Sequence, residues 1–191
     1  MSADTTVTRE RMCGMKVVCF GDSNTFGYDP RSRFGGRYDA ESRWTDILAA
    51  ETGWTVCNMG QNGREIPFAA PDFPADTDLL IVMLGTNDLL QGRSPEQAAG
   101  KLEQFLSGLS LDQNKILLIA PPSMTLGEWA PSQQLLDDSH TFAKRCRALA
   151  KQMGIRFADA GKWNVPLAYD GVHFTAQGHK AFAARLLEEL K

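Results

Sequence analysis

The sequence has no long hydrophobic run and no excess of basic residues. No stretch approaches the ~18 consecutive apolar residues of a membrane-spanning helix. Its 20 Lys and Arg against 23 Asp and Glu give a net charge of -3, which provides no basic surface for a nucleic acid. Residues 1–15 are polar and lack the apolar core of a secretory signal. We therefore expect a cytoplasmic protein with neither a membrane span nor a nucleic-acid partner.

Residues that bind transition metals are also few: the chain has four cysteines and three histidines. The cysteine spacing fits neither a zinc template nor a Cys-x-x-Cys redox pair, so we expect reduced thiols that fill small apolar spaces. His140 and His179 lie on predicted helices and are interpreted as structural. A metal site built from Asp22, Asp170 and His173 has no supporting ligand cluster, so we predict no metal and no cofactor. The cysteines are Cys13, Cys19, Cys57 and Cys146.

The remaining composition is ordinary for a folded domain, with 43% hydrophobic and 23% charged residues. A chain of 191 residues is long enough for one domain that buries most of its apolar surface. The sequence shows no internal repeat, low-complexity tract or linker. Residues 1–15 are expected to form a flexible N-terminal arm, and residues 16–191 a single domain.

Short apolar runs alternate with helical patterns along this domain. An apolar run bounded by turn residues favours a strand buried on both faces, as in a parallel sheet. The alternation predicts an α/β fold, a three-layer α/β/α sandwich with a five-stranded parallel sheet. The expected strand order is the flavodoxin-like 2-1-3-4-5. The predicted strands cover residues 17–20, 54–58, 79–84, 115–120 and 155–159, and the main helices 40–52, 95–109, 132–153 and 176 onward.

Four turns of this pattern are polar. Three directly follow predicted strands, and the strand-to-helix turns of a parallel sheet emerge at one rim, where ligands bind. The fourth precedes the last helix and can fold onto the same rim. With the strand order 2-1-3-4-5, Ser23 lies beside Asn87, with Gly63 on its other side. The turns are Gly21-Asp22-Ser23-Asn24, Gly60 to Gly63, Gly85-Thr86-Asn87-Asp88 and Asp170 to His173.

These turns hold the residue types of a nucleophilic serine site. A hydroxyl is a weak nucleophile until a base removes its proton, and that base needs a third group to orient it. Ser23 is the candidate nucleophile, His173 the base and Asp170 the orienting carboxylate. The alternatives are structural, because Ser and Asp often bond to local backbone in turns. Asp170 and His173 can likewise brace their own loop, and Asp22 is interpreted as a turn or capping residue.

Attack on an acyl carbon generates an oxyanion, which needs hydrogen-bond donors already in place. The backbone N–H groups of Ser23 and Gly63 and the side-chain amide of Asn87 are the candidates. Glycine at position 63 lets the backbone approach the reacting group closely. Gly60 is a second candidate for this glycine, and Asn87 can instead simply shape its turn.

The polar turns, in this order, resemble those of the SGNH (GDSL-type) hydrolase superfamily of esterases, lipases, thioesterases and carbohydrate deacetylases. The resemblance implies an α/β/α fold and a triad of Ser23, His173 and Asp170. It also implies an oxyanion hole formed by Ser23, Gly63 and Asn87. The matching motifs are Gly21-Asp22-Ser23-Asn24-Thr25, Asn58 to Gly63, Gly85-Thr86-Asn87-Asp88 and Asp170-Gly171-Val172-His173.

One residue departs from the superfamily pattern: Asn24 stands where the namesake motif has Leu. We interpret this departure as a matter of substrate fit rather than of chemistry. Counting from Asn58 favours Gly63 over Gly60 as the second-motif glycine. The continuation Thr25-Phe26-Gly27-Tyr28, with Arg43-Trp44, is most similar to the arylesterase and acyltransferase-like branch. That branch acts on short acyl esters, and some of its members are oligomeric, so a homo-oligomer is left open.

The sequence thus predicts a serine hydrolase that cleaves short-chain, acetyl-type esters of small molecules through an acyl-enzyme intermediate. Phe26, Tyr28 and Trp129, with Asp22, are candidate substrate contacts. The alternatives with the same triad are a carbohydrate or cell-wall O-acetyl esterase, a thioesterase and a lysophospholipase. An alternative of another class is a non-catalytic, flavodoxin-like module that binds a phosphate or flavin. Against this module, the chain has no Gly-x-Gly-x-x-Gly motif and no phosphate-binding loop motif.

Overall fold

The computed structural model describes residues 14–32 and 34–191 and contains the five predicted strands. All neighbouring strands are parallel, in the order β2-β1-β3-β4-β5. This confirms the predicted strand order and fold class. Residues 1–13 of the predicted arm lie outside the described residues. The strands are β1 (Lys16–Gly21), β2 (Thr55–Gly60), β3 (Leu79–Met83), β4 (Ile116–Ala120) and β5 (Arg156–Asp159).

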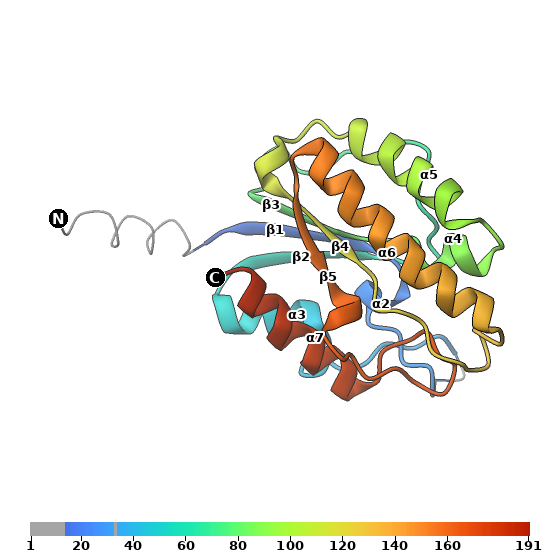
Figure 1. Ribbon diagram of the computed structural model, residues 1–191. Coiled ribbons are helices and arrows are strands. Elements are labelled where there is room, and N and C mark those ends of the chain that lie inside the picture. The colour runs from blue at the N-terminus through green and yellow to red at the C-terminus, as the bar shows by residue number, and fades with distance from the viewer. Residues whose placement is uncertain (1–13, 33) are drawn as a thin grey trace.

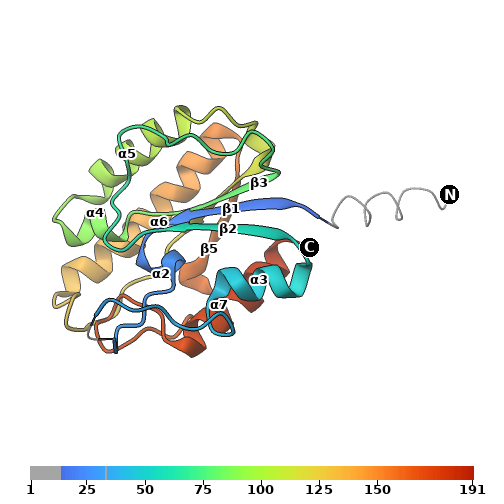
Figure 2. The same ribbon diagram turned by 180° about the vertical axis from the view of Figure 1, so that it is seen from behind.

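Helices cover both faces of the sheet and form the outer layers of the sandwich (Figures 1 and 2). Alternate residues of β1 enter different cores, because successive side chains of a strand point to opposite faces. Cys19 shares one core with Trp44 and Phe182, whereas Phe20 shares the other with Phe105 and Phe142. One face carries α3 (Trp44–Thr52) and α7 (Ala176–Glu189), and the other α4 (Thr86–Leu90), α5 (Pro95–Ser107) and α6 (Gln133–Met153).

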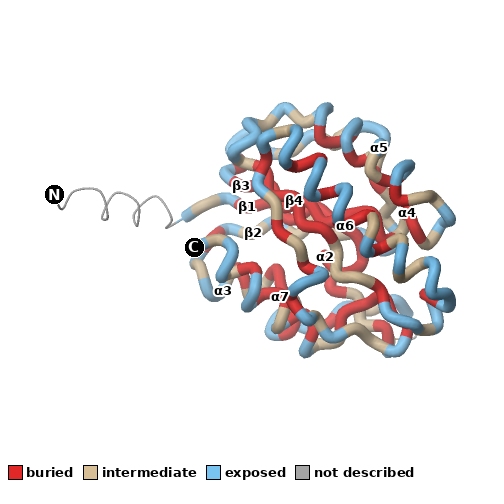
Figure 3. Tube along the Cα trace, in the orientation of Figure 1, coloured by how far each residue is buried: buried red, intermediate tan, exposed pale blue. Residues whose placement is uncertain are grey.

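Burial follows this layering: the three central strands β1, β3 and β4 are buried, the edge strands β2 and β5 are partly exposed, and the helices expose their outer sides (Figure 3). The helix ends follow the sequence signals. Ser94 and Gln97 form a reciprocal capping box at the start of α5, and Thr175 caps α7. Among residues 14–32 and 34–191, no helix combines the length and the apolarity that a membrane crossing requires.

Two of the differences between predicted and observed boundaries have a clear structural cause. The first long helix begins at Trp44 rather than at residue 40, because the carbonyl of Asp39 accepts from the N–H groups of Ser42 and Arg43 in a preceding turn. Strand β2 runs to Gly60 rather than ending at residue 58, because its pairing with β1 continues as far as Gly21 and Gly60.

The expectation for the cysteines is confirmed at two positions and wrong at a third. Cys19 and Cys146 are buried, but Cys57 is exposed. Cys57 lies on β2, which forms an edge of the sheet and is only partly covered. The short apolar pattern of β2 does not distinguish an edge strand from a central one. Cys13 lies outside the described residues.

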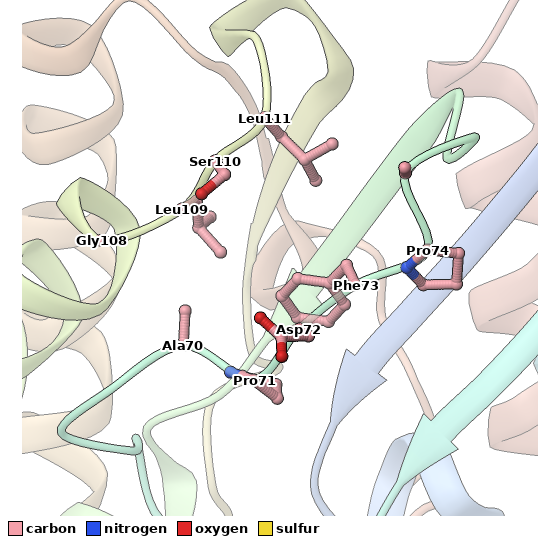
Figure 4. Close-up of a pocket in the computed structure, with 10 residues that line it drawn as sticks. Ala70, Pro71, Asp72, Phe73, Pro74, Gly108, Leu109, Ser110 and Leu111 are labelled. Carbon is pink, nitrogen blue, oxygen red and sulfur yellow. The ribbon is translucent and has the colours of Figure 1, made fainter.

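A hollow of about 250 Å³ lies between the segment leading to β3 and the segment leading to β4 (Figure 4). It is lined by residues 70–75 and by Gly108 to Leu111, with Phe73 and Asp72 among them. None of its lining residues belongs to the four polar turns. The polar turns therefore form a separate region of the molecule.

Gly60 allows the end of β2 to pack tightly against α2 (Ser23–Phe26). A Cβ atom at Gly60 would lie only 2.1 Å from the backbone nitrogen of Phe26 and 2.6 Å from its Cα. These obstacles are backbone atoms, which cannot rotate away as a flexible side chain can. Close packing against α2 therefore requires glycine at position 60.

We predict that Gly60→Ala lowers the free energy of unfolding by about 1–3 kcal/mol through overpacking. The matched control is Gly100→Ala, on the exposed side of α5, where a Cβ meets no atom within 4 Å. That variant should be more stable than wild type by about 0.5–1 kcal/mol, since alanine restricts the unfolded chain more than glycine. Urea denaturation measures both. Equal stability of the two variants would contradict the packing role of Gly60.

Candidate active site

Ser23 lies where β1 turns into the single-turn helix α2. Asp22 caps this helix, because its carboxylate accepts from the backbone N–H of Asn24 at 3.0 Å. The indole N–H of Trp44 donates to the carbonyl of Asn24 at 3.0 Å and thereby ties the turn to the start of α3. The Ser23 hydroxyl is therefore held at the carboxyl end of β1, with only 5% of the residue exposed.

The imidazole of His173 approaches Ser23 from the far end of the chain. Its Nε2 lies 2.9 Å from Ser23 Oγ, and its Nδ1 lies 2.8 Å from Asp170 Oδ2. An ionised carboxylate can only accept, so Nδ1 carries the proton and donates to Asp170. Nε2 is then the acceptor for the Ser23 hydroxyl. The structure thus brings Ser23, His173 and Asp170 together in one chain of hydrogen bonds.

Asp170 is buried but well supplied with donors. Its Oδ1 accepts from the backbone N–H groups of Val172 and His173, both at 2.9 Å. Burial by itself raises the pKa of Asp170, but the hydrogen bonds from the His173 ring and from these two N–H groups outweigh it. The pKa of Asp170 consequently lies below its ordinary value. Asp170 stays ionised at neutral pH, as a stabilising partner of an imidazolium must.

The loop between β4 and α6 packs closely onto the turn that carries Asp170. The N–H of Thr125 donates to Gly171 O, and that of Trp129 to Asp170 O, each at 3.0 Å. A Cβ at Gly127 would lie 2.3 Å from the carbonyl carbon of Asp170. Close backbone contact between the two loops therefore requires glycine at position 127 and holds Asp170 in place.

The turn after β2 is tied to the strand that precedes Ser23. Gln61 N–H donates to Gly21 O at 3.1 Å, and Arg64 Nη1 donates to the same carbonyl at 2.9 Å. Gly63 lies between these anchors with a φ of 71°, in the left-handed region that favours glycine. A Cβ at Gly63 would meet no atom within 4 Å. Its glycine requirement is therefore conformational, whereas that of Gly60 is one of packing.

Asn87, at the start of α4, reaches this same turn. Its Nδ2 donates to Arg64 O at 3.0 Å, which leaves the second amide hydrogen without a partner in the described structure. The next residue, Asp88, is fully buried and accepts from Ile66 N–H at 2.9 Å and from Lys101 Nζ at 2.6 Å. The hydrogen bond from Ile66 thus ties the segment after the turn to α4, and the ion pair with Lys101 ties α4 to α5.

Two side chains that support the site were not predicted from the sequence. The guanidinium of Arg64 stacks on the Phe20 ring at 4.3 Å while bonding to Gly21 O. The side chain of Asn58 donates to Thr25 O at 2.8 Å and to Thr45 Oγ1 at 2.9 Å, which joins β2 to both α2 and α3. Asn58 is the first residue of the second motif, so the motif resemblance pointed to its position. No sequence pattern pointed to Arg64, because an arginine in a turn is usually solvated.

A family model described as the GDSL-like lipase/acylhydrolase family matches residues 19–181. The chain belongs to this family. Membership makes it a carboxylic ester hydrolase, and its fold is that of the SGNH hydrolases, as the motif resemblance predicted. No sequence among the curated proteins matches the chain significantly.

Solved structures share this fold over almost the whole chain. A carbohydrate acetylesterase family member from Sinorhizobium meliloti has a TM-score of 0.76 at 24% identity, covering 92% of this chain and 97% of that one. An aryl esterase from M. smegmatis has a TM-score of 0.74 at 26% identity, covering 93% and 98%. A member of the lipolytic protein G-D-S-L family from Veillonella parvula DSM 2008 has a TM-score of 0.70 at 21% identity, covering 92% and 97%.

Two of the aromatic residues predicted as substrate contacts lie against the His173 ring of this GDSL-family hydrolase. The ring of Tyr28 lies 4.6 Å and that of Trp129 4.8 Å from the imidazole. Trp129 remains 47% exposed, so part of its ring is open to a bound molecule. Phe26 instead packs under the guanidinium of Arg37 at 4.4 Å. In the described residues no ring contact joins Phe26 to His173.

The other two histidines lie away from the Ser23 hydroxyl. His140 is exposed and its Nδ1 lies 2.9 Å from Ser123 Oγ. His179 is fully buried beside the rings of Phe174 and Tyr38, and burial lowers its pKa to about 3. Within residues 14–32 and 34–191, no group of three His, Cys, Asp or Glu side chains could hold a metal ion.

Asp22 is a titratable group buried next to Ser23. Only 2% of it is exposed, and burial raises its pKa from 3.8 to about 6, against the opposing effects of Asn24 N–H, His173 and Arg64. Between these two pKa values the folded protein holds a proton that the unfolded chain has lost. The free energy of unfolding therefore falls as the pH rises through this window.

We predict that Asp22→Asn removes this part of the pH dependence. Asparagine caps a helix as well as aspartate does, so the bond to Asn24 N–H is retained. Relative to wild type, the variant should gain stability between about pH 4 and about pH 7, by at most about 3 kcal/mol. Urea denaturation of both proteins across this range is the measurement. Parallel stability curves for the two proteins would contradict the raised pKa.

Proposed function

We propose that Ser23, His173 and Asp170 form the catalytic triad of an esterase that acts through an acyl-enzyme intermediate. The observation that supports this most is the buried chain of hydrogen bonds, 2.9 Å from Ser23 Oγ to His173 Nε2 and 2.8 Å from His173 Nδ1 to Asp170 Oδ2. In this arrangement the base touches the nucleophile on one side and an ionised carboxylate on the other. This is the geometry that a serine nucleophile requires.

The reaction follows from these contacts. As Ser23 Oγ attacks the ester carbonyl carbon, His173 Nε2 takes its proton, and Asp170 stabilises the resulting imidazolium. The imidazolium then protonates the leaving alcohol, which departs from the acyl-enzyme. Water attacks the acyl-enzyme in the second half, with His173 again taking the proton and returning it to Ser23. The products are a carboxylic acid and an alcohol, and no cofactor takes part in these steps.

We further propose that the oxyanion is held by the N–H groups of Ser23 and Gly63 and by the Asn87 side chain. The Gly60–Arg64 turn is anchored to Gly21, the residue before Asp22. The amide of Asn87 is held next to Gly63 by its bond to Arg64 O. These donors are fixed before substrate arrives, which is what makes such donors effective in catalysis.

The proposed substrates are short-chain, acetyl-type esters. The rings of Tyr28 and Trp129 flank His173 and would face an ester placed on Ser23, which favours a compact acyl group with an alcohol that can pack on an aromatic surface. The name of one similar structure, a carbohydrate acetylesterase family member, agrees with an acetyl group, and that of another, an aryl esterase, agrees with an aromatic alcohol. Acetylated carbohydrate is the second candidate, since sugar rings also pack on exposed Trp. Family membership favours either over a non-catalytic module.

We predict that Ser23→Ala abolishes hydrolysis of p-nitrophenyl acetate and of acetylated sugars while the circular dichroism spectrum is unchanged. The matched control is Ser123→Ala. Ser123 also bonds to a histidine, His140, at 2.9 Å, but in the described part of the chain no carboxylate bonds to that ring. The control should keep full activity. Activity retained in Ser23→Ala, or lost equally in both variants, would contradict the proposal.

We also predict that Asn87→Ala lowers kcat by about 10²–10³-fold, because one oxyanion donor is lost. The exposed Asn114, which precedes β4, provides the control substitution Asn114→Ala. Steady-state kinetics on the same ester compares the two variants. An Asn87→Ala enzyme with wild-type kcat would remove Asn87 from the oxyanion hole and leave its bond to Arg64 O as its role.

A further inference from the structure

The side chain of Asn24 joins the nucleophile turn to the segment that carries His173. Its Nδ2 donates to Val172 O at 3.1 Å, and its Oδ1 accepts from Phe174 N–H at 2.9 Å. The partners fix the orientation of the amide, since a carbonyl needs a donor and an N–H needs an acceptor. The buried side-chain amide of Asn24 is therefore hydrogen-bonded to the peptide groups on both sides of His173.

These two bonds place the turn of His173 relative to Ser23, which the contacts within that turn do not. Asp170 fixes the imidazole within its own turn, through the His173 ring and backbone N–H, but this does not place that turn relative to Ser23. Among the described residues, the hydrogen bonds between residues 22–25 and 170–175 are the Ser23–His173 contact and the two bonds of Asn24. Asn24 is the covalent neighbour of Ser23, so it places His173 directly relative to the nucleophile.

We propose that Asn24 is a positioning residue that sets the distance between Ser23 Oγ and His173 Nε2, an inference that rests on the proposed triad. Asn24 is only 4% exposed, and its amide faces backbone atoms. The contacts thus argue for an effect on proton transfer rather than on the substrate fit expected from the sequence. Leucine, the residue of the namesake motif at this position, can form neither bond.

Asn24→Leu tests this role because leucine keeps the branched shape and the number of side-chain heavy atoms but removes both hydrogen bonds. Misplacing a catalytic group by about 1 Å can cost about 10²-fold in rate. We expect kcat and kcat/KM for p-nitrophenyl acetate to fall together, by about 10–10²-fold. A substrate-binding role would instead raise KM and leave kcat unchanged.

The matched control is Thr25→Val, the adjacent buried polar residue in the same turn. Thr25 is 1% exposed, and its hydroxyl has no hydrogen-bond partner in the described structure. Both substitutions exchange a buried polar group for an apolar one of similar size, but only Asn24→Leu breaks a contact with the His173 segment. Thr25→Val should therefore keep the wild-type kcat. Both enzymes are assayed at a temperature where circular dichroism shows that they are folded.

A wild-type kcat in folded Asn24→Leu would overturn the role of Asn24 and leave the triad intact. Loss of the proposed function has a different signature, namely hydrolysis that persists in Ser23→Ala. Should Asn24→Leu fail to fold, hydrogen exchange of the wild-type protein replaces it. The Phe174 amide is then expected to exchange slowly, since it donates to a buried oxygen. Fast exchange of this amide, as in an exposed loop, would overturn the inference.

Discussion

The hydrogen bond between Ser23 and His173 is the contact on which the site depends, and it joins residues 150 positions apart in the chain. The parallel sheet makes this contact available by placing the end of β1 beside β3, at the rim where the polar turns gather. The last loop must then fold back onto that rim. Burial of Val172 and Phe174 against the cores on either side of the sheet secures this return.

Polar groups are costly to bury unless they are paired, and the carboxylates of Asp22 and Asp170 meet this constraint mainly through backbone N–H groups. Both oxygens of Asp170 accept hydrogen bonds, and Asp22 caps the helix that begins with Ser23. Close backbone approaches at Gly60 and Gly127 remove the space in which the turns could move. The proposed catalytic residues are thus held in place by packing and by hydrogen bonds from groups outside the triad.

Much of the fold could be predicted from the sequence because β1, β3 and β4 are apolar on both faces and polar turns follow β1 and β3. The residue types of the turns made Ser23, His173 and Asp170 candidates for one site, and the motif resemblance implied that they meet; strand order placed only Asn87 and Gly63 beside Ser23. The exposure of Cys57 could not be predicted, because apolar patterning does not show which strand lies at an edge. The supporting contacts of Arg64 and Asn24 could not be predicted from the sequence either. Their partners are backbone atoms of distant segments, which no local pattern identifies.

The most direct test of the central claim is labelling of the wild-type protein with a fluorophosphonate, followed by mass spectrometry of the tryptic peptides. A nucleophile activated by His173 should take up one phosphonyl group, on the peptide of residues 17–31 and at Ser23. A label on Ser123, or no label at neutral pH, would show that Ser23 is not an activated nucleophile.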